Sequence, residues 1–271
     1  LDDVPTGATG QVQYLQSMLE SVRGLNAAAY GALQGAVQTD MAALAAVEVG
    51  FNDTLYGAMA GRVPLAAVGA DAAYAAAMSR PFQGRLLREV LPELGEARMR
   101  RVRDAVRVGF VAGKTSTQIV RELRGTKANG FADGVVEVDR RHLETVVHSA
   151  LSHTAATARN QFMEANKSVI GSQLWLSTID GKTSQICIVR SGKRYTTGEK
   201  PKPIGHSIPW CSKHGCSPGK AHFRCRSTAI GLLKGQESLY GVRASADGPI
   251  DANISYGDWL KRQVDSVQDE V

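Results

Sequence analysis

The most informative stretch of this chain begins with Trp175-Leu-Ser-Thr-Ile-Asp180-Gly-Lys-Thr183-Ser-Gln-Ile-Cys187 and ends with His222-Phe-Arg-Cys225-Arg226. Cys211 and Cys216 lie between these two segments, so the stretch contains all four cysteines of the chain. Thiols gathered in this way beside a histidine and many basic residues indicate a crosslinked or metal-bound module. We therefore expect this module to carry the function of the protein.

The residues around these thiols predict a small antiparallel β module. Residues 173–179 alternate in polarity, Asp180-Gly181 is a hairpin turn signal, and residues 185–189 are expected to form the second strand. Residues 226–233 can supply a third strand. Between these strands, residues 196–221 are rich in proline and glycine and are expected to form a long irregular loop that needs something to hold it.

The N-terminal half of the chain predicts helices. Apolar residues recur at spacings of three, four and seven over residues 12–33, as on one face of a long amphipathic helix. Residues 40–77 are rich in alanine, a strong helix former. Pro64, Pro81 and Pro92 are expected at helix boundaries, because proline lacks the amide hydrogen that a helix interior uses.

Two further helices are expected before the β module. Thr115-Ser-Thr-Gln118 is the pattern of a capping box, which would begin a short helix that Gly125 ends. Asp139 can cap a longer helix whose apolar residues follow a period of 3.6 as far as Phe162.

The three histidines of that longer helix are not expected to bind a metal together. His142, His148 and His153 are spaced by six and five residues, which does not place them on one face of a helix. We expect each of them to lie on the surface or in the core.

These elements define an α+β fold that is mainly α: a helical N-terminal half followed by a small antiparallel β module with a long Cys/His-containing loop. The predicted domains are a helical region for partner docking at 1–125, a module of one long helix and the small β module at 126–234, and an acidic C-terminal tail at 235–271. Because the chain begins at Leu1 without methionine, we expect either a processed product or part of a longer protein, and its end at Gln268-Asp-Glu-Val271 predicts that the protein continues further.

The positive charge of the chain is concentrated in one segment. The net charge is +6, but residues 182–234 alone contain eleven Lys and Arg against one Glu, a net +10. Such a segment attracts an anionic partner such as a nucleic acid or an acidic protein surface, although a solvated surface can carry the same charges. The candidate DNA-binding residues are the basic ones of this segment: Lys182, Arg190, Lys193, Arg194, Lys200, Lys202, Lys213, Lys220, Arg224 and Arg226.

The thiols and one histidine are candidate zinc ligands. Zinc prefers tetrahedral sets of thiolate and imidazole, and such a closed site would hold a loop rich in proline and glycine. Two disulfides or free thiols remain open as alternatives, with disulfides the least favoured because the chain shows no export signal. The candidate ligands are Cys187, Cys211, Cys216, His222 and Cys225, with His206 and His214 as possible substitutes.

The sequence contains neither a complete phosphate-binding loop nor a predicted membrane span. Gly113-Lys-Thr115 and Gly181-Lys-Thr183 end like phosphate-binding loops, but the glycine required five residues before each is Val108 or Leu176. The chain has no apolar run of about eighteen residues and therefore no predicted membrane span.

The ordered residues of the module resemble the phage Mu F-like minor head protein family, also called phage head morphogenesis proteins. The resemblance is carried by a set that runs along the module: Trp175, Asp180, Thr183, Cys187, Gly192, Tyr195 and His222-x-x-Cys225-Arg226. The preceding helix is similar to the segment that leads into the family's module at Thr154, Ala158, Asn160 and Asn166, and the match covers roughly residues 110–232.

One departure from the family's pattern concerns the loop. The family has two consecutive prolines before the histidine, where this chain has Pro218-Gly-Lys-Ala221. Cys211 and Cys216 lie in a stretch whose length varies in the family. The resemblance therefore supports Cys187, His222 and Cys225 as a unit, and leaves the other two cysteines as an addition of this chain.

The resemblance implies a component of the virion of a tailed bacteriophage. Such a protein binds the portal protein and other head proteins at the portal vertex, in few copies per particle, and acts in head assembly and in packaging or ejection of the genome. Its localisation is then the capsid, with the host cytoplasm during assembly. The basic segment would contact the packaged double-stranded DNA without reading its sequence, and no membrane partner is expected.

A function from another class stays open. The Cys/His cluster beside Asp180 could be a catalytic metal site of a nuclease or a toxin-type effector built on the same module. We expect no enzyme, because thiolate-rich zinc sites are usually closed and no general base is evident. A third possibility is a structural adaptor that makes no DNA contact.

Overall fold

The computed structural model describes residues 9–61, 63–81, 84–198, 200–210, 220–236 and 241–269. The chain divides into two compact units, one of residues 1–39 and 87–148 and the other of residues 40–86 and 149–271. Helices α1 (Thr9–Ala60) and α5 (Val135–Ala165) contribute to both. These units are therefore not the three consecutive segments predicted from the sequence.

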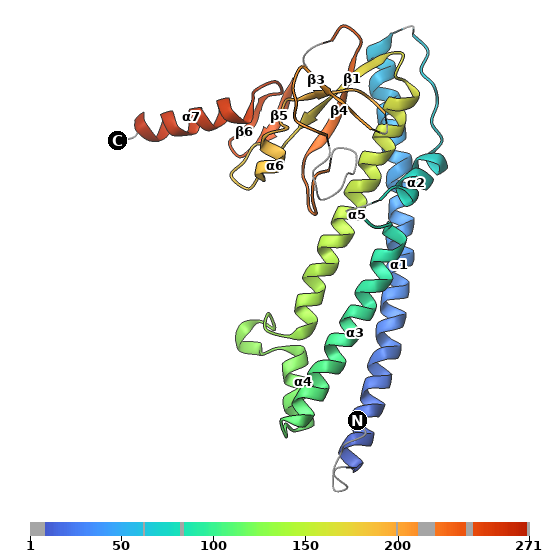
Figure 1. Cartoon of the computed structure of the whole chain (residues 1–271), viewed down its shortest axis with the longest axis vertical. Helices are drawn as coiled ribbons and strands as arrows, with labels where there is room; N and C mark the ends of the chain where they lie inside the picture. The colour runs from blue at the N-terminus through green and yellow to red at the C-terminus, as the bar shows by residue number, and fades with distance from the viewer. Residues whose placement is uncertain are drawn as a thin grey trace. The chain divides into compact units, whose positions relative to one another are not determined.

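The first unit is helical. Besides parts of α1 and α5 it contains α3 (Leu87–Val111), α4 (Ser116–Arg124) and the 3-10 turn η2 (Lys127–Asn129), with α3 and α4 in contact (Figure 1). Leu15, Val106 and Ile119 form its buried core. The close packing of α3 against Ile119 of α4 requires glycine at position 109, because a Cβ there would lie 2.7 Å from Cγ1 of Ile119.

The predicted boundaries of these helices are partly correct. The capping box is confirmed, since the Thr115 side chain accepts from the Gln118 amide and the helix ends at Gly125 with a positive φ. The prediction for Pro92 is wrong, because this proline lies inside α3. Asp139 is not a cap either, since α5 already begins at Val135.

The connection before α5 explains its earlier start. The carboxylate of Asp133 accepts hydrogen bonds from the Thr126 amide and hydroxyl, both at 2.8 Å, and from Nδ2 of Asn129 at 3.1 Å. The loop closes on itself in this way, and the Glu137 amide then bonds to the Gly134 carbonyl to begin the helix. The Asp133 carboxylate thus closes the connection two residues before α5 begins.

The second unit contains a four-stranded sheet packed with helices. Its strands β1 (Ile170–Leu176), β2 (Arg194–Tyr195), β3 (Pro203–Ile204) and β4 (Thr228–Leu233) pair in the antiparallel order β3-β2-β1-β4 (Figure 1). The end of α1, α2 (Ala70–Ser79) and the end of α5 belong to the same unit. The predicted fold class, mainly α with a small antiparallel sheet, is confirmed.

Two polar contacts attach the helices to the sheet. The Tyr56 hydroxyl of α1 donates to the Gly231 carbonyl at 3.1 Å and accepts from the Gly231 amide at 2.8 Å. Arg159 of α5 pairs with Glu48 of α1 at 2.5 Å and also donates to the hydroxyl of Thr228 in β4. Strand β4 is therefore held from both helices.

The strand predicted at residues 185–189 is wrong. Residues Gln185–Ile188 form a helical turn, α6, whose Cys187 and Ile188 amides bond to the Ser184 carbonyl. The Thr183 hydroxyl donates to the Thr178 carbonyl at 2.6 Å, which closes the turn after β1 before a hairpin can form. The strands predicted at 173–179 and 226–233 correspond to β1 and β4.

The segment expected as an acidic tail is folded in its described part. It contains the hairpin β5 (Val242–Ser245) and β6 (Gly248–Asp251) and the helix α7 (Tyr256–Asp269). Tyr256 and Trp259 pack on Ile179, and the Tyr256 hydroxyl donates to the Asp180 carbonyl at 2.9 Å. This segment therefore supports the residues that follow β1.

No helix in the described part of the chain is both long and apolar enough to cross a membrane. Of the three histidines on α5, His142 and His148 are exposed and His153 is buried, with Nε2 at 3.1 Å from the Ala77 carbonyl. The expectation that they occupy the surface or the core is confirmed.

The buried His153 predicts a pH-dependent stability. Burial lowers the pKa of His153 to about 4, despite the hydrogen bond to Ala77, whereas an unfolded histidine titrates near pH 6.5. Because the folded pKa is depressed, the neutral ring stabilises the fold above pH 6.5, and this stability is lost as the pH falls towards 4. Between pH 7 and 4.5 we expect the wild type to lose about 2–3 kcal/mol more than the variant His153→Gln, measured by urea unfolding.

The exposed His142 on the same helix provides the matched control. His142→Gln should lose as much stability between the two pH values as the wild type does. Equal losses in His153→Gln and His142→Gln would contradict the role given to burial.

Candidate metal centre

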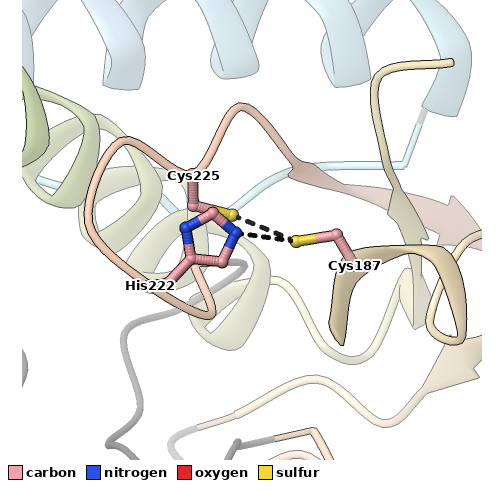
Figure 2. Close-up of side chains that lie close together, drawn as sticks. All are labelled: Cys187, His222 and Cys225. Atoms are coloured by element: carbon pink, nitrogen blue, oxygen red, sulfur yellow. Dashed lines mark hydrogen bonds between the residues drawn. The ribbon is translucent and has the colours of Figure 1, made fainter. Parts of the chain in front are cut away.

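Three of the predicted ligands come together in the second unit. Sγ of Cys187 lies 3.5 Å from Sγ of Cys225 and 3.4 Å from Nε2 of His222 (Figure 2). One ligand atom from each residue lies within 4.8 Å of the others, close enough to hold a metal ion. The other two predicted ligands, Cys211 and Cys216, lie outside the described residues.

The turn α6 places Cys187 in this cluster. A strand through residues 185–189 would alternate its side chains, whereas the turn directs Cys187 inward, where 2 % of it is exposed. The Ser177 hydroxyl donates to the Cys187 carbonyl at 2.7 Å and accepts from Nε1 of Trp175 at 3.1 Å. The end of β1 thereby fixes the backbone of the turn.

The loop before β4 supplies the other two ligands, and Lys220 ties it down. Its ammonium group donates to the Ser227 carbonyl at 2.6 Å and to the Cys225 carbonyl at 3.2 Å. Burial lowers the pKa of Lys220. This lysine was predicted to bind DNA, but its ammonium group bonds the protein's own carbonyls.

The hydrogen bonds of His222 orient its ring for ligation. Nδ1 lies 2.7 Å from the Phe223 carbonyl, which can only accept, so Nδ1 carries the hydrogen and Nε2 carries the lone pair. Nε2 faces Cys187 and lies 2.8 Å from the Ser184 hydroxyl. A backbone carbonyl that fixes the second ring nitrogen is the usual support of a metal-binding histidine.

The two thiols share a hydrogen bond that shifts their pKa values in opposite directions. Cys187 and Cys225 are free thiols in the described chain. The bond between them lowers the pKa of Cys225 and raises the pKa of Cys187. A thiolate at Cys225 is the form that binds a metal, whereas a disulfide would require the sulfur atoms to approach from 3.5 Å to about 2.05 Å.

An aromatic core supports the centre. The rings of Trp175 and Trp210 meet edge to face at 5.0 Å, and Tyr195 meets Trp210 in the same way at 4.9 Å. Arg190 is 5 % exposed, its guanidinium lies over Trp175, and it donates to the carbonyls of Ile186, Pro209 and Trp210. Arg190 was predicted to contact DNA, but its side chain is buried and bonded within the module.

An ion pair encloses the centre from the side of β1. Arg226 donates to both carboxylate oxygens of Asp180, at 2.5 and 2.7 Å, and this contact holds the pKa of Asp180 well below its usual range. The Lys182 amide also donates to Asp180 at 3.0 Å. The pair joins the turn before α6 to the loop that holds His222 and Cys225.

The remaining DNA-binding candidates differ in exposure. Besides the buried Arg190, the described candidates fall into two groups. The exposed ones are Lys182, Lys200, Lys202, Arg224 and Arg226. The partly buried ones are Lys193, Arg194 and Lys220. Lys213 lies outside the described residues. A cavity of about 40 Å³ beside Cys187 and His222 is lined by three of the exposed ones, Lys182, Arg224 and Arg226.

The sequence did not single out the serines of the site. Ser184 contacts His222, and the Ser227 hydroxyl donates to Ser177 at 3.3 Å beneath the turn. A serine carries no signal of its own in a sequence, and only the proximity of α6 to the loop before β4 gives these hydroxyls a role.

No protein-family model matches this chain, and no curated protein or solved structure matches it. The resemblance to the Mu F-like family therefore rests on the motif residues alone.

Proposed function

We propose that this protein is a minor head protein of a tailed bacteriophage, bound at the portal vertex, whose zinc-held module contacts the packaged DNA without sequence preference. The observation that carries the proposal is the convergence of the motif residues. Those that resemble the Mu F-like pattern occupy one site: Trp175 and Tyr195 in its core, Cys187, His222 and Cys225 at its centre, and Asp180 with Arg226 at its edge. Motif residues that are far apart in the sequence thus lie together in one site, which supports their interpretation as a single motif.

Zinc fits the donor set best. Two sulfurs and an imidazole nitrogen are its preferred ligands, and two of the three side chains are buried. The zinc would be structural, since it would join the turn α6 to the loop before β4. Among the described residues no fourth ligand joins these three side chains, and Cys211 and Cys216 are the candidates for it.

The zinc proposal predicts about one zinc per chain, measured by elemental analysis of the purified protein. Cys225→Ala and His222→Gln should each weaken zinc binding at least tenfold in competition with a coloured chelator, because each removes a ligand. The exposed His148 offers a matched control, and His148→Gln should bind zinc as the wild type does. Equal zinc content in the wild type and Cys225→Ala would rule out this centre.

The DNA proposal rests on the exposed cations next to the centre. Lys182 and Arg224 are exposed and line the same cavity. Lys182→Gln and Arg224→Gln should each weaken binding to duplex DNA of any sequence. Each should also reduce the slope of log affinity against log salt by about 0.9, measured by fluorescence anisotropy.

Lys167 is the control for that experiment, because it is exposed in the same unit but lies outside residues 182–234. Lys167→Gln removes the same charge and should leave the slope unchanged. If all three variants lose affinity equally, the binding is a property of net charge and the assigned surface is wrong. Cleavage of the DNA in the same samples, with added divalent metal, would favour the alternative of a nuclease.

The location in the virion has its own test. A map of assembled phage heads, with the protein labelled, should show it at the portal vertex in few copies. A protein absent from purified particles that contain the genome would overturn the assignment as a head protein, whatever its affinity for DNA.

A further inference from the structure

An apolar cavity of the first compact unit shares no lining residue with the cavity beside the metal centre. Its volume is about 620 Å³, within the range of binding clefts, about 300–1,000 Å³. Residues of α1, α3, α4, the connection before α5 and the start of α5 line it. Leu25, which lines it from α1, is 72 % exposed, and the lining residues Val120 and Val136 are exposed as well. A partner in solution can therefore reach these side chains.

Phe131, at the edge of this cavity, has a backbone conformation that its side chain disfavours. Its φ is 66°, in the left-handed region that is rare for a bulky residue and ordinary for glycine. The connection holds this conformation, because the Phe131 amide donates to the Thr126 carbonyl at 2.8 Å and its carbonyl accepts from the Gly134 amide at 3.2 Å. The chain thus keeps an aromatic ring where glycine would fit with less strain.

The ring of Phe131 is only partly buried by the fold. It is 40 % exposed, and the guanidinium of Arg124 lies over it at 5.4 Å from the ring centroid. A cation over an exposed ring contributes little, so neither burial nor this contact accounts for the strain. Strained residues gather at ligand contacts, and exposed apolar surface gathers at interfaces. Both observations indicate that the ring contacts a partner.

The cations of the cavity indicate an acidic partner. Arg98 and Arg124 both line it, and among the described residues neither has a carboxylate partner. The acidic lining residue Glu137 is already paired, because Arg140 donates to its two oxygens at 2.7 and 2.9 Å. The described lining therefore presents two positive charges that nothing neutralises beside an apolar surface.

We propose that this cavity docks an acidic amphipathic helix of a protein partner. A helix that lies in an apolar groove contacts it with side chains at i, i+3, i+4 and i+7. These side chains would pack on Leu25, Val120 and Phe131. Carboxylates beside them would pair with Arg98 and Arg124. The apolar lining favours such a helix over a nucleic acid, whose outer surface is phosphate.

The inference goes beyond the proposed DNA contact, which concerns the other compact unit, and does not rest on it. Its test adds the full chain to three labelled synthetic peptides of about fourteen residues and measures their fluorescence anisotropy. All three have leucine at i, i+3, i+4 and i+7, and their other positions are mainly Glu, Gln or Lys in turn. The Glu peptide should bind about tenfold or more tightly than the Lys peptide, with the Gln peptide between them. The difference should shrink as the salt concentration rises.

Phe131→Gly separates a contact with the partner from a role in the fold. It should bind the Glu peptide about tenfold or more weakly than the wild type, because it removes an exposed anchor. Its melting temperature should equal or exceed that of the wild type, because glycine adopts this φ without strain. A ring that served the fold alone would give the reverse, a lower melting temperature with unchanged affinity.

Two further variants have matched controls on the same helices. Arg124→Gln should weaken the Glu peptide about threefold and leave the Gln peptide unchanged, whereas Arg121→Gln, on the same α4 but outside the lining, should leave both unchanged. Leu25→Ser should weaken all three peptides, and Tyr14→Ser, exposed on the same α1 outside the lining, should weaken none.

Four results would overturn the inference. They are no binding of the Glu peptide by the wild type, equal affinity of the wild type for the Glu and Lys peptides, and equal affinity of the wild type and Phe131→Gly for the Glu peptide. The fourth is a wild-type dimer in sedimentation that Phe131→Gly dissociates, because a second copy would then be the occupant. The duplex experiment fails or succeeds separately, since Lys182 and Arg224 lie outside this cavity and their variants should bind the Glu peptide as the wild type does.

Discussion

The antiparallel pairing of β1 with β4 is the interaction on which the candidate metal centre depends. Its register places Trp175 opposite Ala229 and Leu176 opposite Thr228. Because paired antiparallel strands leave and enter a sheet at the same end, the residues after β1 and those before β4 must meet there. Cys187 and Cys225 are 38 positions apart in the chain and nevertheless bring their sulfurs to 3.5 Å.

The sequence predicted both of these strands but not that they pair, because it expected a hairpin between residues 173–179 and 185–189. Alternating polarity identified the first strand, residues 226–233 were expected to supply a third, and the ordered motif identified Cys187, His222 and Cys225 as a unit. The segment Ile186-Cys187-Ile188-Val189 has the β-branched composition of a strand, yet it forms a helical turn. The contacts that decide its shape involve the Thr178 carbonyl and Arg226, which is 46 residues from Asp180, and a local pattern contains neither.

Charge was the poorest guide to the partner surface, because the number of cationic residues in a sequence does not show which of them are buried in the structure. Arg190 and Lys220 belong to the segment of net charge +10, but each donates to backbone carbonyls of its own module. Side chains that carry only donors suit this role, since loops poor in regular structure leave carbonyls without partners. The positive field offered to a partner therefore comes from fewer residues than the composition indicates.

The aromatic core limits what a bound zinc would do. Trp175, Tyr195 and Trp210 pack together with Ala229 of β4, so the sheet has a buried core that does not depend on the ligands alone. The loop that holds His222 and Cys225 is attached by Lys220, by the Asp180–Arg226 pair, by the Arg224 amide on the Ser149 hydroxyl, and by Ala221 and Cys225 in the same core. In the proposed function, zinc would add a direct link between this loop and the turn α6. Arg224 lies on the same loop, so ordering it in advance would reduce the entropy lost when Arg224 contacts DNA. Metal binding and DNA affinity would then be coupled, although the metal itself touches no phosphate.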